Sequence, residues 1–387
     1  MTAVTTAGAD PAGRPWRVLI AGGGTGGHLF PALAIAEALG KMAPETTIRF
    51  AGSRHGIEHR VIPERGYRLH RIAVRGLYGV SWFRRLWVLA MLPVAFFQCA
   101  WILLCWRPHL VMGVGGYASG PMLATALLFR FRCVIQEQNA APGMTNRLLG
   151  RFVPLAFTAV EDEGGCFRRA VVTGNPVRAE ILALREAPAG APAGIPGQAH
   201  PTKPAPLVLV LGGSQGAHAL NAAMSDALPI LQGWERPPRI LHQSGPREFE
   251  TVRETYRRST LPPGEAEVRP FIDDMAAAYR EARIVVSRAG ASAIAEIVAA
   301  RRASVLVPIP GTSGDHQLRN AERLAGAKAA VLIEQRDLSG ARLAGTLKEL
   351  LDDPARLDAM EAATDALFQG DAAATIAKTC LELMAGR

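Results

Sequence analysis

Short apolar runs separated by helical stretches recur along almost the whole chain. In the first half, the runs that predict buried strands are Arg17–Ala21, Thr47–Ala51, Leu110–Gly113, Cys133–Gln136 and Val171–Thr173. In the second half they are Leu207–Leu211, Arg239–His242, Arg283–Ser287, Ser304–Pro308 and Ala329–Ile333. Strands that alternate with helices form parallel sheets with crossover helices, so the pattern predicts an α/β protein with doubly wound sheets.

The two series of strands indicate two domains, at residues 16–176 and 207–365, as a chain of 387 residues also suggests. Residues 177–206 between them predict a hinge and a Pro/Ala-rich linker, because that composition cannot bury a core. Residues 1–15 are small and polar, lack the apolar stretch of a secretory signal, and predict a disordered leader. Residues 366–387 predict a C-terminal helix that could pack back on the N-terminal domain.

The two halves open with similar segments. Val18–His28 and Val208–His218 each read as an apolar strand, a glycine-rich turn and a His at the start of a helix. Two similar nucleotide-type domains, one in each half, explain this repeat, although a chance match of two glycine-rich turns remains an alternative.

The uncharged segment Leu86–Trp106 is flanked by Arg84, Arg85 and Arg107 and reaches the length of about 20 residues that a spanning helix needs. It lies between predicted strands of one sheet, which argues against spanning. Three interpretations stay open: a spanning helix, a helix lying in the membrane interface, and a buried crossover helix. Trp82, Trp87, Trp101 and Trp106 favour the interface.

The balance of charge is basic, with 43 Lys and Arg against 34 Asp and Glu. Such a surface attracts anionic lipids or phosphorylated substrates. Aromatic residues interleaved with Arg are missing outside the segment just described, so no nucleic-acid partner is predicted. The five cysteines form no CxxC pair, which argues against a disulfide framework or a structural zinc.

Glycine-rich turns between a strand and a helix let a phosphate approach the backbone, and Gly22–His28 and Gly212–Gly216 both fit this description. A tight turn with no ligand is the alternative interpretation. An NAD site would require an acidic residue at the end of the second strand, which instead ends in Gly52 and Ser53. This counts against a dehydrogenase.

Three further polar segments follow predicted strands. They are Gln136–Asn139, Ser287–Glu296 and Gly314–Asn320. In the second, the backbone N–H groups at the helix start would face a diphosphate and Glu296 would bind ribose or stabilise the helix dipole. In the third, capping by Asp315 competes with sugar recognition by His316 and Gln317. Ligands gather at the carboxyl ends of strands in such sheets, so the common location is the stronger signal.

These motifs together resemble the MurG family of peptidoglycan GlcNAc transferases. The resemblance covers the chain from Trp16 onward. It rests on the segments already named and on Gly113–Gly120 and Thr173–Arg178. It implies a GT-B fold, with two Rossmann-like domains facing across a cleft. It further implies transfer of GlcNAc from UDP-GlcNAc to the MurNAc 4-hydroxyl of lipid I, with inversion, giving lipid II for the cell wall, cell shape and division.

The resemblance also implies roles for individual residues. Ile272 would contact uracil, Glu296 the ribose, and Gln317 the GlcNAc. The other donor contacts it implies are Thr25, Gly26, Gly27, Asn139, Arg178, Ser214, Ala291, Ser292, Ala293, Ile294 and Ala295. Gly115, Gly116 and Tyr117 would lie on the acceptor side.

His28 is the candidate general base, because inversion needs a group that removes the proton of the acceptor hydroxyl. The alternative is a His that caps its helix or positions a phosphate, since no second titratable partner is visible in the sequence. No Asp-x-Asp-like pair is placed to hold a metal, so we expect neither a metal nor a cofactor. The expected location is peripheral, on the cytoplasmic face of the inner membrane, with an anionic lipid surface and other cell-wall synthesis proteins as partners.

Three other functions remain in competition. An NAD(P)-dependent dehydrogenase would explain the first glycine-rich turn, and a non-catalytic membrane protein would explain Leu86–Trp106. A GT-B transferase of a UDP-sugar to a different lipid is the nearest rival.

Overall fold

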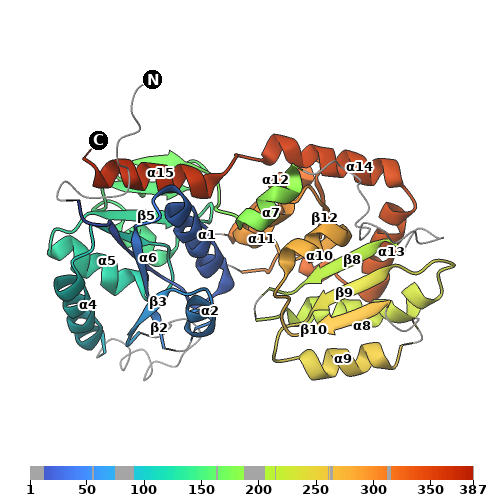
Figure 1. Cartoon of the computed structure of the whole chain (residues 1–387). Coiled ribbons are helices and arrows are strands. Elements are labelled where there is room, and N and C mark those ends of the chain that lie inside the picture. The colour runs from blue at the N-terminus through green and yellow to red at the C-terminus, as the bar shows by residue number, and fades with distance from the viewer. Residues whose placement is uncertain are drawn as a thin grey trace. The chain divides into compact units, whose positions relative to one another are not determined.

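The chain forms two compact units in a computed structural model (Figure 1). The structure describes residues 13–386 except 55, 75–90, 163, 187–204, 214, 260, 262–264 and 312–314. The N-terminal unit contains Met1–Arg178 and Gln369–Arg387, and the C-terminal unit contains Ala179–Phe368. The start of the segment predicted as a hinge, residues 179–186, therefore belongs to the C-terminal unit, and most of the predicted linker lies outside the described residues.

The N-terminal unit is built on a seven-stranded sheet in which every pairing is parallel. Its strand order is β3-β2-β1-β4-β5-β6-β7. The strands are β1 (Arg17–Ala21), β2 (Thr47–Ser53), β3 (Arg68–Ile72), β4 (Leu110–Gly113), β5 (Cys133–Glu137), β6 (Leu155–Thr158) and β7 (Ala170–Val172). The helices are α1 (Gly26–Met42), α2 (Glu58–Glu64), α4 (Leu92–Trp106), α5 (Ser119–Leu128), α6 (Met144–Leu149) and α15 (Ala372–Met384).

The C-terminal unit has a six-stranded parallel sheet in the order β10-β9-β8-β11-β12-β13. The strands are β8 (Leu207–Leu211), β9 (Arg239–Gln243), β10 (Ala266–Arg269), β11 (Ala282–Ser287), β12 (Ala303–Leu306) and β13 (Ala330–Leu332). The α-helices are α7 (Ala179–Leu182), α8 (His218–Gln232), α9 (Phe249–Arg257), α10 (Met275–Glu281), α11 (Ala291–Ala299), α12 (His316–Gly326), α13 (Gly340–Leu351) and α14 (Pro354–Ala363). Single turns of 3₁₀ helix are η1 (Ala183–Arg185), η3 (Gln335–Asp337) and η4 (Thr364–Leu367).

The repeated segments occupy equivalent places in the two sheets. β1 lies between β2 and β4, and β8 lies between β9 and β11. Each is the first strand of its unit and is followed by a glycine-rich turn and a helix. The repeat detected in the sequence therefore marks the point in each unit where the strand order reverses.

Side chains of β1 alternate between two cores. Val18 and Ile20 join the cluster under α1 and α15, whereas Leu19 and Ala21 join the cluster under α4 and α5. Helices therefore cover both faces, as expected for parallel strands that are apolar on both sides. α15 lies beside α1 in this unit (Figure 1).

All ten strands predicted from the sequence are present, and β1, β4 and β8 have the predicted bounds. β3, β6 and β10 were missed. β3 and β10 lie at sheet edges, and their sequences, Arg-Leu-His-Arg-Ile and Ala-Glu-Val-Arg, carry charges that hide the apolar pattern. β6 is only four residues long.

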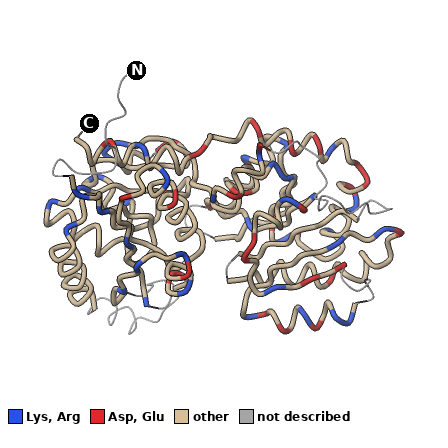
Figure 2. Tube along the Cα trace, viewed as in Figure 1, with Lys and Arg blue, Asp and Glu red and all other residues tan. Residues whose placement is uncertain are grey.

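The described part of the uncharged segment forms α4, the crossover between β3 and β4, which carries no charged residue (Figure 2). One side of α4 faces the core, where its residues Ala95, Cys99 and Leu103 are buried. On α4, Phe97 and Trp101 are instead 70% and 73% exposed. Within the described ranges, no helix combines the length and apolar character needed to cross a bilayer. Trp82, Arg84, Arg85 and Trp87 lie outside the described residues.

Candidate active site

The turn Gly22–Gly24 joins β1 to α1 at the carboxyl edge of the first sheet. The strand order reverses between β1 and β4, and open α/β sheets bind ligands at such points. Gly23 has a φ of 125° and Gly24 a φ of 89°, values that residues with a side chain rarely adopt. Glycine is therefore required here for the backbone itself.

His28 lies in the first turn of α1 and is half-buried. Its Nδ1 is hydrogen-bonded to Thr25 Oγ1 at 3.0 Å, and a Cβ on Gly115 would lie 2.9 Å from its Nε2. Burial lowers the pKa of His28 below its ordinary value, while the Glu137 and Glu58 carboxylates act in the opposite direction. The net lowering keeps the imidazole neutral at pH 7, the form that accepts a proton.

Helix capping does not account for His28. The N-cap of α1 is Thr25, whose hydroxyl bonds to the imidazole and makes no cap hydrogen bond to the backbone. Two carboxylates within electrostatic range of His28 provide the titratable neighbours that the sequence did not reveal.

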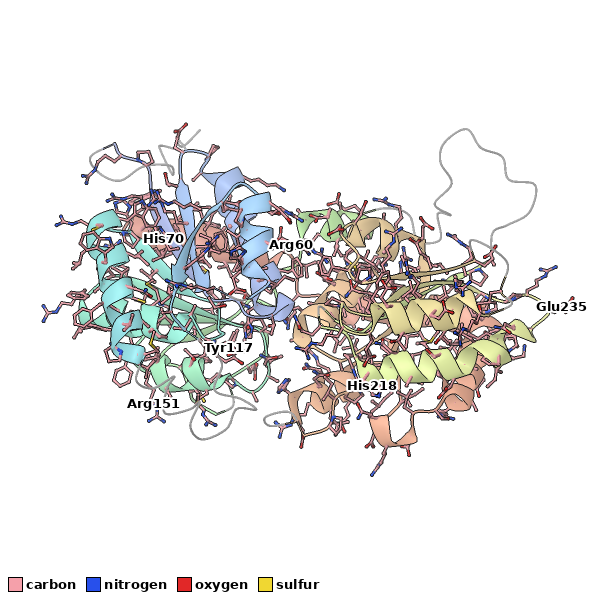
Figure 3. The ribbon with its side chains drawn as sticks, turned by 90° about the horizontal axis from the view of Figure 1, so that it is seen from below. Arg60, His70, Tyr117, Arg151, His218 and Glu235 are labelled. Atoms are coloured by element: carbon pink, nitrogen blue, oxygen red, sulfur yellow. The ribbon has the colours of Figure 1, made fainter. Side chains whose placement is uncertain are left out.

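The loop after β4 packs directly on the glycine-rich turn. Gly116 has a φ of 81°, and a Cβ there would lie 2.2 Å from the carbonyl oxygen of Gly23. The ring of Tyr117 faces Gly24 and is 46% exposed (Figure 3). The structure therefore brings the residues predicted on the acceptor side next to the loop that contains His28.

Glu137, the last residue of β5, organises the neighbouring strand end and is only 2% exposed. Its Oε1 accepts hydrogen bonds from the backbone N–H and the Nδ2 of Asn139, at 2.9 and 3.1 Å. Its Oε2 accepts from the N–H of Gly143 at 3.0 Å and from Nδ2 of Asn146 at 2.9 Å. The carboxylate therefore fixes Asn139, a predicted donor contact, at the same edge of the sheet as His28.

A second buried carboxylate, Glu58, bears on whether the N-terminal unit could bind NAD. It begins α2, just beyond the end of β2, and is fully buried. It accepts hydrogen bonds from the N–H of Gly24 and from both the N–H and the hydroxyl of Ser53. A carboxylate enclosed in this way cannot reach ribose hydroxyls, in agreement with the sequence argument against NAD.

The C-terminal unit has an equivalent turn at residues 212–216. Gly216 has a φ of 81°, and a Cβ there would lie 2.3 Å from the carbonyl oxygen of Ser244. This close crossing of two backbones requires glycine. Ser214, a predicted diphosphate contact, lies outside the described residues.

Gln243, the last residue of β9, ties this turn to the next loop. Its Nε2 donates to the carbonyl oxygen of Gly213 at 3.0 Å, and its Oε1 accepts from the N–H of Ile272 at 2.9 Å. Ile272 as a whole is 1% exposed, and its N–H is already bonded to Gln243, so it leaves little surface for a contact with uracil. Nothing in the sequence indicated the role of Gln243.

α11 begins at the carboxyl end of β11. Its N-cap is Gly290, and all six residues Ala291–Glu296 are half-buried. The hydroxyl of the fully buried Tyr279 donates to Glu296 Oε2 at 3.4 Å. A helix N-terminus attracts an anion, and Glu296 lies about one turn further along, within reach of a group attached to that anion.

Two predicted donor contacts have defined positions elsewhere. Gln317 lies in the first turn of α12, and its Oε1 accepts from the N–H of Ile309 at 3.1 Å. Asp315, at the N-cap, makes no capping bond through its side chain, so the capping interpretation is wrong. Arg178 is 5% exposed and places its guanidinium 4.7 Å from the centre of the Phe30 ring in α1.

Each unit thus gathers one group of predicted residues. The N-terminal unit holds Thr25–His28, Gly115–Tyr117, Asn139 and Arg178, and the C-terminal unit holds Ile272, Ala291–Glu296 and Gln317. Across the described part of the chain, no three His, Cys, Asp or Glu side chains gather in a way that could hold a metal ion.

Both units match domains of a known protein family. Residues 18–158 match the glycosyltransferase family 28 N-terminal domain, and residues 207–379 match the glycosyltransferase family 28 C-terminal domain. Two similar proteins come from Anaeromyxobacter dehalogenans strain 2CP-C and Syntrophus aciditrophicus strain SB. Each is 43% identical, over 96% and 95% of this chain and 94% and 99% of their own lengths. Both are named UDP-N-acetylglucosamine–N-acetylmuramyl-(pentapeptide) pyrophosphoryl-undecaprenol N-acetylglucosamine transferase.

Solved structures agree with the fold. Acinetobacter baumannii MurG is 28% identical and superposes with a TM-score of 0.69, covering 94% of this chain and 99% of its own. The calicheamicin glycosyltransferase CalG4 is 16% identical with a TM-score of 0.64, covering 96% and 98%, and supports the fold alone. The fold is therefore GT-B, with two Rossmann-like units.

Proposed function

The chain belongs to glycosyltransferase family 28, within its MurG group, and from this premise we propose that it transfers GlcNAc from UDP-GlcNAc to lipid I, giving lipid II. The identity of 43% over nearly the full length of relatives with that name carries this assignment. The protein is accordingly a hexosyltransferase. The acceptor group would be the MurNAc 4-hydroxyl.

The C-terminal unit would bind the donor. The N-terminus of α11, at Ala291–Ala293, carries a partial positive charge that stabilises the diphosphate of UDP and the charge that develops on it as the sugar leaves. Glu296 would accept hydrogen bonds from the ribose hydroxyls, held by the hydroxyl of Tyr279. Ile272 would lie next to uracil, with Ile294, Ala295 and Gln317 along the same site.

The N-terminal unit would supply the acceptor site and the base. His28 is neutral at pH 7 and held by Thr25, so it can take the proton of the attacking hydroxyl. Attack opposite the departing UDP inverts the anomeric carbon. Gly115, Gly116 and Tyr117 border the same loop and would contact the acceptor.

A transfer assay tests this function directly. Purified protein, UDP-GlcNAc and lipid I should give lipid II, and His28→Ala should lower kcat by about 100-fold or more, the size of a lost general base. Donor affinity should stay within a few-fold because the predicted contacts to uracil, ribose and diphosphate lie in the other unit. His218→Ala, a change of the equivalent exposed His in the C-terminal unit, is the matched control. Near-normal turnover by His28→Ala would show that the base lies elsewhere.

We propose further that the protein is peripheral on the cytoplasmic membrane face, docked through α4 and its neighbours. Val94, Phe97, Trp101 and Leu104 form an exposed apolar stripe on one side of α4. Phe96 stacks on Phe129 at 6.4 Å between ring centres, which continues the apolar surface toward the end of α5.

Basic residues border this surface. Arg107 follows the last residue of α4 and Arg130 follows Phe129, and both are exposed. Arg147 in α6, which contacts α5, and Arg151 just after it are exposed as well (Figure 3). Anionic headgroups favour such residues by about 1 kcal/mol each. An apolar stripe with a basic border fits an anionic lipid surface, where the acceptor's pyrophosphate lies.

Vesicle binding tests the docking surface. Phe97→Ser with Trp101→Ser should weaken binding to anionic vesicles by about 10-fold or more, because two large apolar side chains lose their contact with lipid. UDP-GlcNAc affinity should be unchanged. Ile230→Ser, an exposed apolar residue of the C-terminal unit, is the control. Wild-type vesicle binding by the folded double variant would refute this surface.

A further inference from the structure

Glu58 is a fully buried carboxylate that has no part in the chemistry proposed above. Its Oε2 accepts the N–H of Gly24 at 2.8 Å. Its Oε1 accepts the N–H and the hydroxyl of Ser53 at 2.9 and 2.7 Å. Burying an ionised carboxylate is costly unless hydrogen bonds compensate it, so these three neutral donors must hold it firmly.

Three glycines enclose this carboxylate. A Cβ on Gly23 would lie 2.7 Å from Cδ of Glu58, and one on Gly52 would lie 2.7 Å from Cγ. A Cβ on Gly56 would lie 1.9 Å from Oε2. The space is therefore the size of one carboxylate, and the chain has glycine at all three positions that border it.

The enclosed carboxylate determines which backbone N–H groups of the glycine-rich turn point inward. Gly22 donates its N–H to the carbonyl oxygen of Ala51 in β2, and Gly24 donates its N–H to Glu58. Both groups point inward and are unavailable to a ligand. Thr25, the N-cap of α1, is the first exposed residue after these two groups.

The turn is held from both sides. Glu58 lies beneath Gly24, and a Cβ on Gly24 would lie 3.6 Å from the ring of Tyr117 above it. Immediately after the turn, α1 begins and places His28 in its first turn. Any displacement of Gly24 would therefore move the start of α1 and the imidazole with it.

We propose that Glu58 is a positioning residue of the transfer site, which sets the glycine-rich turn so that His28 faces the acceptor hydroxyl. This inference rests on the proposed function for its kinetic consequences. Glu58 touches no substrate and acts through Gly24 and the start of α1. It also places a negative charge within electrostatic range of His28.

Glu58→Gln tests both the positioning of the turn and the effect of the negative charge near His28, with little change in the shape of the side chain. An amide has one oxygen, so its NH₂ group must face either the N–H of Gly24 or the two donors of Ser53, and a donor then opposes a donor. We expect kcat to fall by about 10- to 100-fold, as expected for the loss of a hydrogen bond to a charged group. The KM for UDP-GlcNAc should change much less than kcat, because the predicted contacts to uracil, ribose and diphosphate lie in the other unit and only those of Thr25–Gly27 border this turn.

The pH profile distinguishes positioning from a general loss of structure. Removing the negative charge should lower the pKa of His28 further, so the acidic limb of kcat should move to lower pH. Glu58→Asp keeps the charge but shortens the side chain by one CH₂. It should therefore lose turnover while its acidic limb stays near the wild-type position.

Glu64→Gln is the matched control, because Glu64 is exposed at the other end of α2. If Glu58→Gln does not fold, Ser53→Ala removes the hydroxyl donor to Glu58, together with the acceptor of the Gly56 N–H, and should give a smaller effect in the same direction. An NMR titration of His28 without substrate gives a readout that is independent of the transfer reaction. It separates failure of this inference from failure of the proposed function.

A lower His28 pKa in Glu58→Gln, together with reduced kcat and an unchanged donor KM, would support the inference. A His28 pKa and a kcat equal to those of the wild type would overturn it. A rise in donor KM as large as the fall in kcat would also overturn it, because the effect would then not be confined to the turn.

Discussion

The buried imidazole of His242 predicts that the C-terminal unit loses stability in weak acid. His242 lies in β9 and has no exposed surface. Its Nε2 is 3.1 Å from Oδ1 of Asn221, whose Nδ2 already donates to Ser244 and Glu248, so Nε2 must carry the hydrogen. Nδ1 then accepts from the hydroxyl of Tyr256 at 2.9 Å. The neutral ring is fully satisfied, whereas protonation would require the Tyr256 hydroxyl to turn and accept, and would place a positive charge away from solvent.

Burial lowers the pKa of His242 to about 4, whereas an imidazole in the unfolded chain titrates near 6.5. Above pH 6.5 both states are neutral and His242 has no effect on the pH dependence. As pH falls from about 6.5 toward 4, only the unfolded state takes up the proton, so the folded state loses stability. The loss is about 2 kcal/mol at pH 5 and about 3 kcal/mol well below pH 4.

Urea unfolding at pH 7.5 and pH 5.0 measures this loss. His242→Gln removes the titrating group and keeps an N–H donor. It should be less stable than the wild type at pH 7.5, because Gln replaces a ring whose two nitrogens are both hydrogen-bonded. The difference between the two proteins should shrink by about 2 kcal/mol at pH 5.0. An equal difference at both pH values for His242→Gln would refute the reasoning.

Three further predictions concern the donor site and the core. Glu296→Ala should raise the KM for UDP-GlcNAc by about 10- to 100-fold, because hydrogen bonds from ribose to a charged group are lost. An unchanged KM in a stable variant would remove the ribose assignment. Gln243→Ala breaks the link between Gly213 and Ile272 and should weaken UDP binding by about 5- to 50-fold in calorimetry, for the loss of two ordering hydrogen bonds. Equal UDP affinity would show that the link does not shape the site. Ile376→Ala should lower the free energy of unfolding by about 2–4 kcal/mol in urea titrations, because Ile376 is fully buried in α15. Little change would mean that α15 adds no core packing.

Sequence reasoning succeeds where local pattern and global position agree. β8 is apolar throughout and β1 is apolar after Arg17 because helices cover both faces of each sheet, and their glycine-rich turns need positive φ. The same signals predicted two doubly wound α/β domains and the segments that border the site, and the resemblance to the MurG family implied the GT-B architecture. The edge strands β3 and β10 were missed because a strand with one neighbour tolerates charges that a central strand excludes.

The missed site residues share a different cause. Glu58, Glu137 and Gln243 act through hydrogen bonds to backbone groups of other segments. A buried carboxylate and an exposed one look alike in a sequence, and only the fold shows which N–H groups surround each. The sequence alone could not show a titratable partner for His28, because the two carboxylates near it, Glu58 and Glu137, are far from it along the chain and lie at or just after the ends of other strands.

The return of α15 to the first unit fixes the order in which the chain can fold during synthesis. Ile376, Ala377 and Cys380 complete the core under α1, and Arg132 donates to the carbonyl oxygens of Leu383 and Met384. The C-terminal unit is one continuous stretch and can close as soon as Phe368 has left the ribosome. The first unit must wait for α15, so its apolar face on α1 stays open until α15 has followed the whole C-terminal unit off the ribosome, and the half made first is completed after the half made second.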